Sequence, residues 1–371
     1  MKYRVSCLTP VLVGDGQKLS PIDYMVWKDH VNVLDQRRII KLLAKGPRLD
    51  SYLNQVRRAE KLDFASWGGF AQNFAGRRIP FEHSSLTAIW EKQRADTLFI
   101  PTFASGAAGP YLPASALRGA LHTAYLSSRW TDQIWKQLED KIQGDRLPRR
   151  PAEPAEDAAI GLNGHSRMRS FAIADSSPAG AIAMKVYMLR TSTLAARGQG
   201  RYELGWKPAP YFCEMAPPGS AFEGSWSEKT FLSHPEVLRA LRWREVISTR
   251  ALLDAANHFA ARVLAIHRQY AATTGLQQLD RGLAALESTL ASIRDSGASS
   301  CLLAIGWGAG FLSKSACPDT GHETCRRILR QMPVYSRAIQ TGLPFPKTRR
   351  IVFEAGEPAS LPGWVLLEVN P

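Results

Sequence analysis

The sequence lacks any run of about 18 apolar residues, the length that a helix needs to cross a bilayer. Its first residues, Met1–Pro10, contain no apolar segment of the kind found in signal peptides. Only five cysteines occur among 371 residues, and their odd number and uneven spacing argue against a disulfide framework. These absences predict a cytoplasmic protein without a membrane partner.

Acidic residues are also in short supply. The chain has 33 Asp and Glu against 47 Lys and Arg, which gives a formal net charge of +14. An excess of this size predicts an anionic partner, nucleic acid in particular. The 10 Trp, 10 Tyr and 14 Phe residues supply rings on which bases can stack, although large aromatic side chains more often serve the core. The length allows two domains or one elaborated domain.

Familiar catalytic motifs are absent, since the sequence has neither HExxH nor a nucleophile elbow. His122 and His30 are the histidines that we consider for acid–base cleavage of RNA. Asp15 lies in a glycine turn, where an aspartate usually caps its own loop, although it is also suited to assist an attack or hold a metal. We assign no catalytic residue and no cofactor.

Four residues carry zinc-ligand chemistry, namely Cys301, Cys317, His322 and Cys325. Their spacing matches no standard zinc motif, and Cys301 belongs to an apolar run that predicts a buried strand. Small cysteines in a hydrophobic core are the alternative interpretation. We therefore assign no metal and leave zinc binding by these four residues open.

A glycine-rich segment near the C-terminus is the most informative stretch. In LLAIGWGAGFLSKS, an apolar run predicts a short strand that breaks at Gly306, Gly308 and Gly310 and leads to Lys314. The segment fits neither a dinucleotide-binding motif nor a P-loop, because no helix follows the glycines and Lys314 follows a serine. Bare backbone N–H groups beside a lysine are suited to a phosphate. A glycine turn packed on a sheet, with no ligand, is the alternative.

Two further stretches show comparable chemistry. The strand predicted over Tyr3–Leu8 also runs into glycines, Gly14 and Gly16, with Lys18 two residues later. In YLPASALRGALHTAY, proline favours the first turn of a helix, and the face opposite its leucines carries Ser115, Arg118 and His122. A helix N-terminus beside an arginine can hold a phosphate, whereas an ordinary amphipathic helix is the alternative.

The remaining basic residues cluster with aromatic residues. ARGQGRYELGWKP places Arg197, Arg201 and Lys207 around a tyrosine and a tryptophan, as in loops that contact single-stranded RNA. Arg349 and Arg350 form a second cluster before the last apolar segments.

Local patterns predict several elements. Asp23–Trp27 and His30–Leu34 read as a hairpin, and Asp35 as the N-cap of a helix, Gln36–Ala44, whose Ile39, Ile40, Leu42 and Leu43 face the core. Residues 144–161 are rich in Pro, Ala and charge and are predicted to be disordered. Helices are expected over Pro235–Ala272, with a break, and Leu276–Arg294. Ile351–Glu354 and Trp364–Val369 are predicted to form a closing hairpin.

Four stretches together carry a family resemblance. They are LTPVLVGDGQKLSPIDYMV, YLPASALRGALHTAY, YFCEMAPPGSAFEGSW, and LLAIGWGAGFLSKS with PKTRRIVF. Because these four stretches occur in this order, the chain resembles the RAMP proteins of CRISPR effector complexes, and most of all the fifth Csm subunit of type III-A systems. The resemblance leaves the exact type III subtype open.

The resemblance implies an α+β fold, with an RRM-like (ferredoxin-like) RAMP core, helical insertions and a C-terminal β part. We expect the core over residues 1–227, a helical segment over 228–295, and a glycine loop with a β hairpin over 296–371, completing or repeating the core. The implied function is a non-catalytic subunit that caps the 3′ end of the CRISPR RNA and supports its maturation in antiviral defence.

Implied partners are CRISPR RNA, target RNA indirectly, the backbone RAMP subunit, the small helical subunit and a recruited host nuclease. The backbone subunit cuts target RNA with an aspartate in a loop of its first domain, and Asp15 lies in a different setting. An RNA-processing endoribonuclease of the same superfamily and a stand-alone single-strand RNA-binding protein are the alternatives. The residues expected to contact RNA are Gly14, Asp15, Gly16, Lys18, Ser115, Arg118, His122, Arg197, Arg201, Lys207, Gly306, Gly308, Gly310, Lys314, Arg349 and Arg350.

Overall fold

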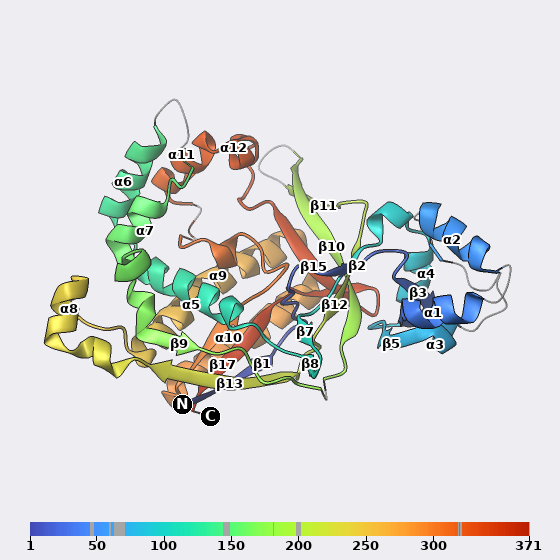
Figure 1. Cartoon of the computed structure of the whole chain (residues 1–371). Coiled ribbons are helices and arrows are strands. Elements are labelled where there is room, and N and C mark those ends of the chain that lie inside the picture. Colours follow the sequence, from blue (N-terminus) through green and yellow to red (C-terminus); the bar gives the residue numbers. More distant parts are fainter. Residues whose placement is uncertain are drawn as a thin grey trace.

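Two five-stranded antiparallel sheets form the body of the protein (Figure 1). The computed structural model describes residues 1–44, 48–58, 61–62, 71–143, 149–180, 182–197, 202–317, 319 and 321–370. The first sheet has the order β14-β17-β1-β13-β9, with strands β1 (Lys2–Cys7), β9 (Phe171–Ile173), β13 (Ala221–Glu228), β14 (Ser300–Ala304) and β17 (Trp364–Val369). The second has the order β11-β10-β15-β16, with β12 also paired to β10; its strands are β10 (Lys185–Ala196), β11 (Tyr202–Trp206), β12 (Tyr211–Met215), β15 (Thr348–Glu354) and β16 (Glu357–Ser360). The fold is therefore α+β, as predicted.

Strand β1 lies at the centre of the first sheet, and its side chains alternate between a buried and an exposed face. Tyr3, Val5 and Cys7 are buried, whereas Lys2 and Arg4 are exposed on the other face. The strand pairs with β13 on one side and with β17 on the other. Both ends of the chain thus share one sheet, and the termini lie side by side (Figure 1).

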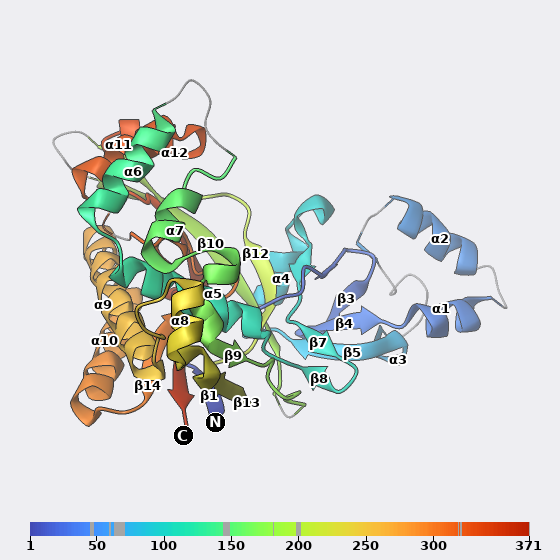
Figure 2. The same ribbon diagram turned by 60° about the vertical axis from the view of Figure 1, so that its left-hand side comes forward.

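Helices cover the first sheet (Figure 2). The long helices α9 (Thr249–Thr274) and α10 (Gln277–Ser296) pack against each other and against β14, and α5 (Ala114–Ser128) packs against α9. Leucines recur at helical spacing along the buried face of α10, as the sequence predicts: Leu279, Leu283, Leu286 and Leu290.

The predicted break in the first helical tract is confirmed. Helix α8 (Pro235–Leu241) ends at Arg242, whose φ of 55° is left-handed. Helix α9 starts after Ser248, whose side chain accepts a hydrogen bond from the Ala251 N–H at 3.2 Å.

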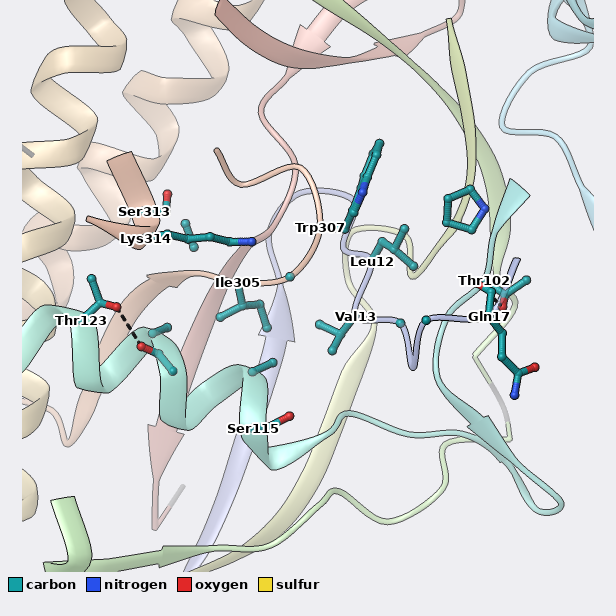
Figure 3. Close-up of a pocket in the computed structure, with 18 of the residues that line it drawn as sticks. Leu12, Val13, Gln17, Thr102, Ser115, Thr123, Ile305, Trp307, Ser313 and Lys314 are labelled. Carbon is teal, nitrogen blue, oxygen red and sulfur yellow. Dashed lines mark hydrogen bonds between the residues drawn. The ribbon is translucent and has the colours of Figure 1, made fainter. Parts of the chain in front are cut away.

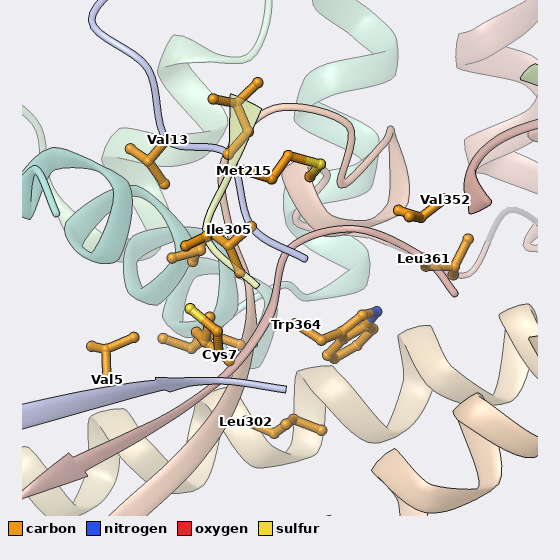
Figure 4. Packing of buried hydrophobic residues seen from close by; sticks show 14 of the residues in the cluster. Val5, Cys7, Val13, Met215, Leu302, Ile305, Val352, Leu361 and Trp364 are labelled. Atoms are coloured by element: carbon orange, nitrogen blue, oxygen red, sulfur yellow. The ribbon is translucent and has the colours of Figure 1, made fainter. Parts of the chain in front are cut away.

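The largest hydrophobic core joins the two ends of the chain (Figure 4). Val5 and Cys7 of β1 pack in the same cluster as Leu302 of β14 and Trp364 of β17, and none is more than 2% exposed. The backbone N–H of Trp364 donates to Thr9 Oγ1 at 3.0 Å. Folding of this core therefore needs the first and the last strand together.

The described residues between 20 and 97 form an accessory lobe on one side of the body (Figures 1 and 2). Its small sheet consists of β3 (Tyr24–Trp27), β4 (His30–Leu34) and β5 (Ala75–Pro80), and its helices are α1 (Gln36–Leu43), α2 (Arg48–Arg58), α3 (Ala71–Phe74) and α4 (Ser85–Glu91). A separate cluster of buried side chains, including Met25, Ile39 and Tyr52, holds it together.

Several predictions for this lobe are confirmed. Lys28 and Asp29 both have positive φ and close the β3–β4 hairpin. The Asp35 carboxylate accepts hydrogen bonds from the N–H groups of Arg37 and Arg38, at 3.0 and 3.2 Å. The prediction that Ile40 faces the core is wrong, because this side chain is 53% exposed. The side chain of Leu42 lies outside the described residues.

A second group of helices, α6 (Asp132–Ile142), α7 (Glu153–Ile160), α11 (Glu323–Gln331) and α12 (Pro333–Gln340), shares its own core. The prediction of disorder over 144–161 is wrong for its second half. Helix α7 buries Ala155 and Ile160, because the alanines of this segment are helix formers that pack against α6. Residues 144–148 lie outside the described residues.

The predicted closing hairpin is also wrong. Strand β15 turns back after two residues, Ala355 and Gly356, both with positive φ, and pairs with β16. Strand β17 instead joins the first sheet between β14 and β1. Local patterns showed two adjacent strands but not the partners that each would find.

The short strands near the site are β2 (Lys18–Leu19) paired with β6 (Ile100–Pro101), and β7 (Ser105–Gly106) paired with β8 (Gly109–Pro110). The 3₁₀ turns are η2 (Ala95–Thr97), η3 (Asn163–His165), η4 (Arg167–Ser170), η5 (Thr230–Ser233) and η6 (Leu312–Lys314).

Candidate nucleic-acid interface

A pocket of about 660 Å³ opens where the two glycine segments meet helix α5 (Figure 3). Its walls come from three parts of the chain that are far apart in sequence. Residues that the sequence singled out line all three walls: Gly14, Gly16, Lys18, Ser115, Gly306 and Lys314. The structure therefore brings together the strand-end turn, the start of α5 and the C-terminal glycine loop.

Direct backbone contact holds the two glycine segments together. The Trp307 N–H of the C-terminal loop donates to the Leu12 carbonyl of the first segment at 2.7 Å. Gly306 has φ of 77°, and a Cβ on it would lie 2.2 Å from the Leu12 carbonyl oxygen. Only glycine permits this approach. The first glycine segment and the C-terminal loop thus form one wall.

Two lysines bring positive charge to the pocket. Lys314 ends the turn η6, which is anchored by the buried residues Leu312 and Ser313. Its side chain extends across the pocket, with Gln17 and Thr102 on the opposite side (Figure 3). Lys18 Nζ lies 4.4 Å from the centre of the Phe99 ring. Both lysines are exposed, so their charges remain available to an anion.

Helix α5 contributes less than its sequence suggested. Ser115 lines the pocket, whereas Arg118 and His122 are not among its lining residues. His122 Nε2 lies 2.9 Å from a carboxylate oxygen of Glu156 on α7. At the helix start, the Ala114 N–H donates to the Asp175 carboxylate at 2.7 Å. An anion of the protein itself already occupies this N–H, so the geometry does not support a phosphate there.

Asp15 has the geometry of a residue that caps its own turn. Its carboxylate accepts a hydrogen bond from the Gln17 N–H at 3.0 Å, and Asp15 is not among the residues that line the pocket.

The remaining glycines face a second pocket, of about 260 Å³. Gly308 and Gly310 line it together with Lys207, Arg349 and Arg350. Gly308 has φ of 91°, and a Cβ there would meet Pro362 Cγ at 2.8 Å. The glycine loop thus gives one side to each pocket.

Trp307 stands between the two pockets. It lines the first pocket, and its ring centre lies 4.4 Å from the guanidinium carbon of Arg350, which lines the second. Tyr211, which is 39% exposed, meets the Trp307 ring edge-on at 5.6 Å. Cation–π contact fixes the Arg350 charge beside the tryptophan.

Arg349 is only 7% exposed, in contrast to Arg350. Its Nε donates to His267 Nδ1 at 3.0 Å, and burial lowers the pKa of Arg349 to about 10. Burial and the neighbouring Arg349 charge lower the pKa of His267 well below its ordinary value, so this imidazole is neutral.

Of the basic hairpin, Lys207 lines the second pocket, whereas Arg197 lines neither pocket. Arg197 is exposed at the end of β10 and forms a bidentate ion pair with Glu203, at 2.9 and 3.1 Å. Arg201 lies outside the described residues.

Sequence reasoning missed three residues that shape this interface: Trp307, Tyr211 and Asp175. Trp307 had a usable signal, because it is a large aromatic residue between two glycines of a loop. Asp175 had none, since its contact with α5 spans 61 positions.

The described residues contain no group of three His, Cys, Asp or Glu side chains that could hold a metal ion. Cys301 is fully buried in β14. Cys317 Sγ lies 3.9 Å from the Asp319 carbonyl oxygen, and His322 stacks on Trp135 with ring centres 5.4 Å apart. Among the helices that the structure describes, none has the length and apolar character to cross a membrane.

No protein-family model matches the sequence, and no curated protein matches it. Two of the solved structures that match cover nearly the whole chain. The first is a chain of the cryo-EM structure of a Csm-crRNA-target RNA ternary complex of a type III-A CRISPR-Cas system, with a TM-score of 0.69 and 20% identity, covering 99% of this chain and 100% of that chain. The second is Csm5 of T. onnurineus, with a TM-score of 0.63 and 17% identity, covering 98% of this chain and 99% of that chain. The resemblance seen in the sequence is confirmed at the level of the fold: over its whole length, this chain is folded like Csm5.

Proposed function

We propose that this chain is the Csm5-like, RNA-binding subunit of a type III-A effector complex. In this role it caps the 3′ end of the CRISPR RNA and supports maturation of that end during antiviral defence. One observation carries the proposal: the pocket between the glycine segments and α5, with Lys18 and Lys314 at its edge, lies in a chain that has the Csm5 fold throughout.

The chemistry of the pocket suits an RNA backbone. Glycines let a sugar–phosphate chain approach closely, and two exposed lysines supply charge without an acidic residue among the described lining residues. A half-buried tryptophan at the edge offers a ring for a base. Such a site reads the RNA chain rather than its sequence, as a subunit that carries many different guides must.

We further propose that the first sheet with its helices is an RRM-like core. The N-terminal region 1–227 and the C-terminal region 296–371 together complete this core, which the antiparallel pairing of β1 with β17 supports. The helical segment 228–295 covers one face. The backbone RAMP subunit and the small helical subunit are the proposed protein partners, with a recruited host nuclease and, indirectly, target RNA.

A non-catalytic role is favoured over an endoribonuclease. The Asp15 carboxylate binds its own turn, His122 is paired with Glu156, and His30 Nδ1 lies 2.8 Å from the Lys28 carbonyl. None of these groups lines the pocket where RNA would lie.

The experiment is reconstitution of the effector complex with and without this chain. We expect the chain to co-purify with the complex, and its omission to change the length distribution of CRISPR RNA 3′ ends. Purified alone, it should bind RNA without cutting it. Cleavage by the purified chain would instead favour the endoribonuclease, and RNA binding without any association with the complex would favour a stand-alone protein.

A further inference from the structure

The second pocket has an unusual charge composition. Lys207, Arg349 and Arg350 line it, and none of the described residues that line it is Asp or Glu. Three cations around about 260 Å³ with no carboxylate repel each other. Arg77, by contrast, is paired with Glu214 at 2.6 Å.

Arg349 gives the strongest argument that this pocket binds an anion, because its charge is buried. Its Nε donates to the neutral His267, and its Nη1 donates to the backbone carbonyls of Thr348, at 2.9 Å, and Pro346. The Tyr270 ring lies 4.6 Å from the guanidinium carbon. These contacts satisfy donors but provide no negative charge. A buried cation is costly unless an anion compensates it, so the site fits a ligand that brings the missing charge.

The geometry points to a phosphate group of RNA as that anion: we propose that the second pocket binds one, with Arg349 at its base and Lys207 and Arg350 at its mouth. The inference rests on the proposed RNA-binding function and assigns a phosphate to this side of the glycine loop. Gly308 and Gly310 leave the approach free of side chains. Because Arg350 also contacts Trp307, the phosphate site borders the first pocket directly.

The phosphate can come from inside the RNA chain or from a terminal phosphate. Both present the same oxygen atoms to a guanidinium. The distinction matters for an end-capping subunit, and the experiment separates the two sources.

The first measurement is thermal melting with inorganic phosphate as the probe, against chloride at equal ionic strength. We expect phosphate to raise the melting temperature of the parent chain. Lys207→Met should weaken this apparent affinity about tenfold, as expected for one lost hydrogen bond to a charged group, while melting without phosphate is unchanged because Lys207 is exposed. Lys207→Arg should retain the effect. Lys136→Met, an exposed lysine on α6, is the matched control.

The second measurement compares single-stranded RNA ending in a 3′-hydroxyl with the same RNA ending in a 3′-phosphate. Tighter binding of the phosphorylated RNA, lost in Lys207→Met but not in Lys136→Met, supports a terminal phosphate. Equal binding of both RNAs, weakened equally by Lys207→Met, supports an internal one. The proposal is overturned if phosphate fails to stabilise the parent chain, or if Lys207→Met binds RNA like the control.

The two proposals can fail separately. If RNA binding does not depend on Lys207, the proposed function is retained but the phosphate site in this pocket is contradicted. Stabilisation by phosphate that depends on Lys207, in a chain that binds no RNA, keeps the anion site and removes the proposed function.

Discussion

Gly306 shows how a single residue decides the shape of the interface. Its positive φ and the close Leu12 carbonyl both exclude a side chain. The glycine therefore serves first to join two loops and only then to admit a ligand. This combines the two interpretations that the sequence left open, a structural turn and a binding loop.

We predict that Gly306→Ala lowers the free energy of unfolding by about 3 kcal/mol, because strain from the left-handed backbone adds to a clash with Leu12. The matched control is Gly219→Ala, where φ is 84° and nothing lies within 4 Å of the added Cβ. That variant should lose only about 1 kcal/mol. Urea unfolding of both measures the difference, and equal losses would show that the Leu12 contact is unimportant.

Replacing Lys314 tests whether its charge at the first pocket contributes to RNA binding. Lys314→Ala should leave the melting temperature unchanged, since exposed substitutions stay within about 0.5 kcal/mol, while RNA binding weakens. The slope of log K against log salt should become shallower by about 0.7, the value for one lost phosphate contact with a single strand. Lys136→Ala should change neither quantity. An unaltered slope for Lys314→Ala would place the RNA elsewhere.

At the level of elements, an ion pair connects the accessory lobe to the body. Arg77 on β5 binds Glu214 on β12 through both carboxylate oxygens, at 2.6 and 3.1 Å. Glu214 is fully buried, and burial raises its pKa above the ordinary value although Arg77 opposes this shift.

We predict that Arg77→Met destabilises the protein by about 3 kcal/mol at neutral pH, because it leaves a buried carboxylate without its partner. Glu214 has a raised pKa in the folded protein and therefore binds protons more readily there than in the unfolded chain. The loss of stability in Arg77→Met is therefore largest above the pKa of folded Glu214, and it shrinks as the pH falls through that pKa. Urea unfolding at pH 7 and pH 5 tests this. Adding Glu214→Gln to Arg77→Met should remove most of the pH dependence, and a loss that is the same at both pH values contradicts the account.

Elements set by local chemistry were predictable from the sequence. The positive-φ turn at Lys28-Asp29, the Asp35 cap and the leucine period of α10 each depend on residues within one or two turns of each other. The partner of β17 was not predictable in this way. A strand pattern shows which face is buried but not which distant strand it meets, so the closing hairpin was wrong.

For the candidate site too, local features were predictable and long-range contacts were not. The glycine segments could be recognised because glycine itself allows the backbone conformations that a tight loop needs. Their meeting, through the Trp307 N–H and the Leu12 carbonyl, depends on the whole sheet and could only be suspected from their likeness. At the start of α5, the sequence could not show that a distant carboxylate, Asp175, accepts a hydrogen bond from the Ala114 N–H.

At the scale of the whole molecule, the net charge of +14 and the two basic pockets act together. We predict that binding to single-stranded RNA falls steeply with salt and varies little with sequence, because the contacts address phosphates. Filter binding with several RNAs of equal length and different composition, at several salt concentrations, tests this. Affinity that ignores salt, or that follows base composition, would contradict a backbone-reading site.

The hydrogen bond between Trp307 and Leu12 also has a consequence for synthesis at the ribosome. The Leu12 carbonyl emerges among the first residues, but Trp307, which binds it, comes only after most of the chain has been translated. The pocket therefore cannot form in a polypeptide that does not yet include Trp307. On the proposed function, we expect a polypeptide that lacks Trp307 not to hold RNA there and therefore not to compete for the guide RNA.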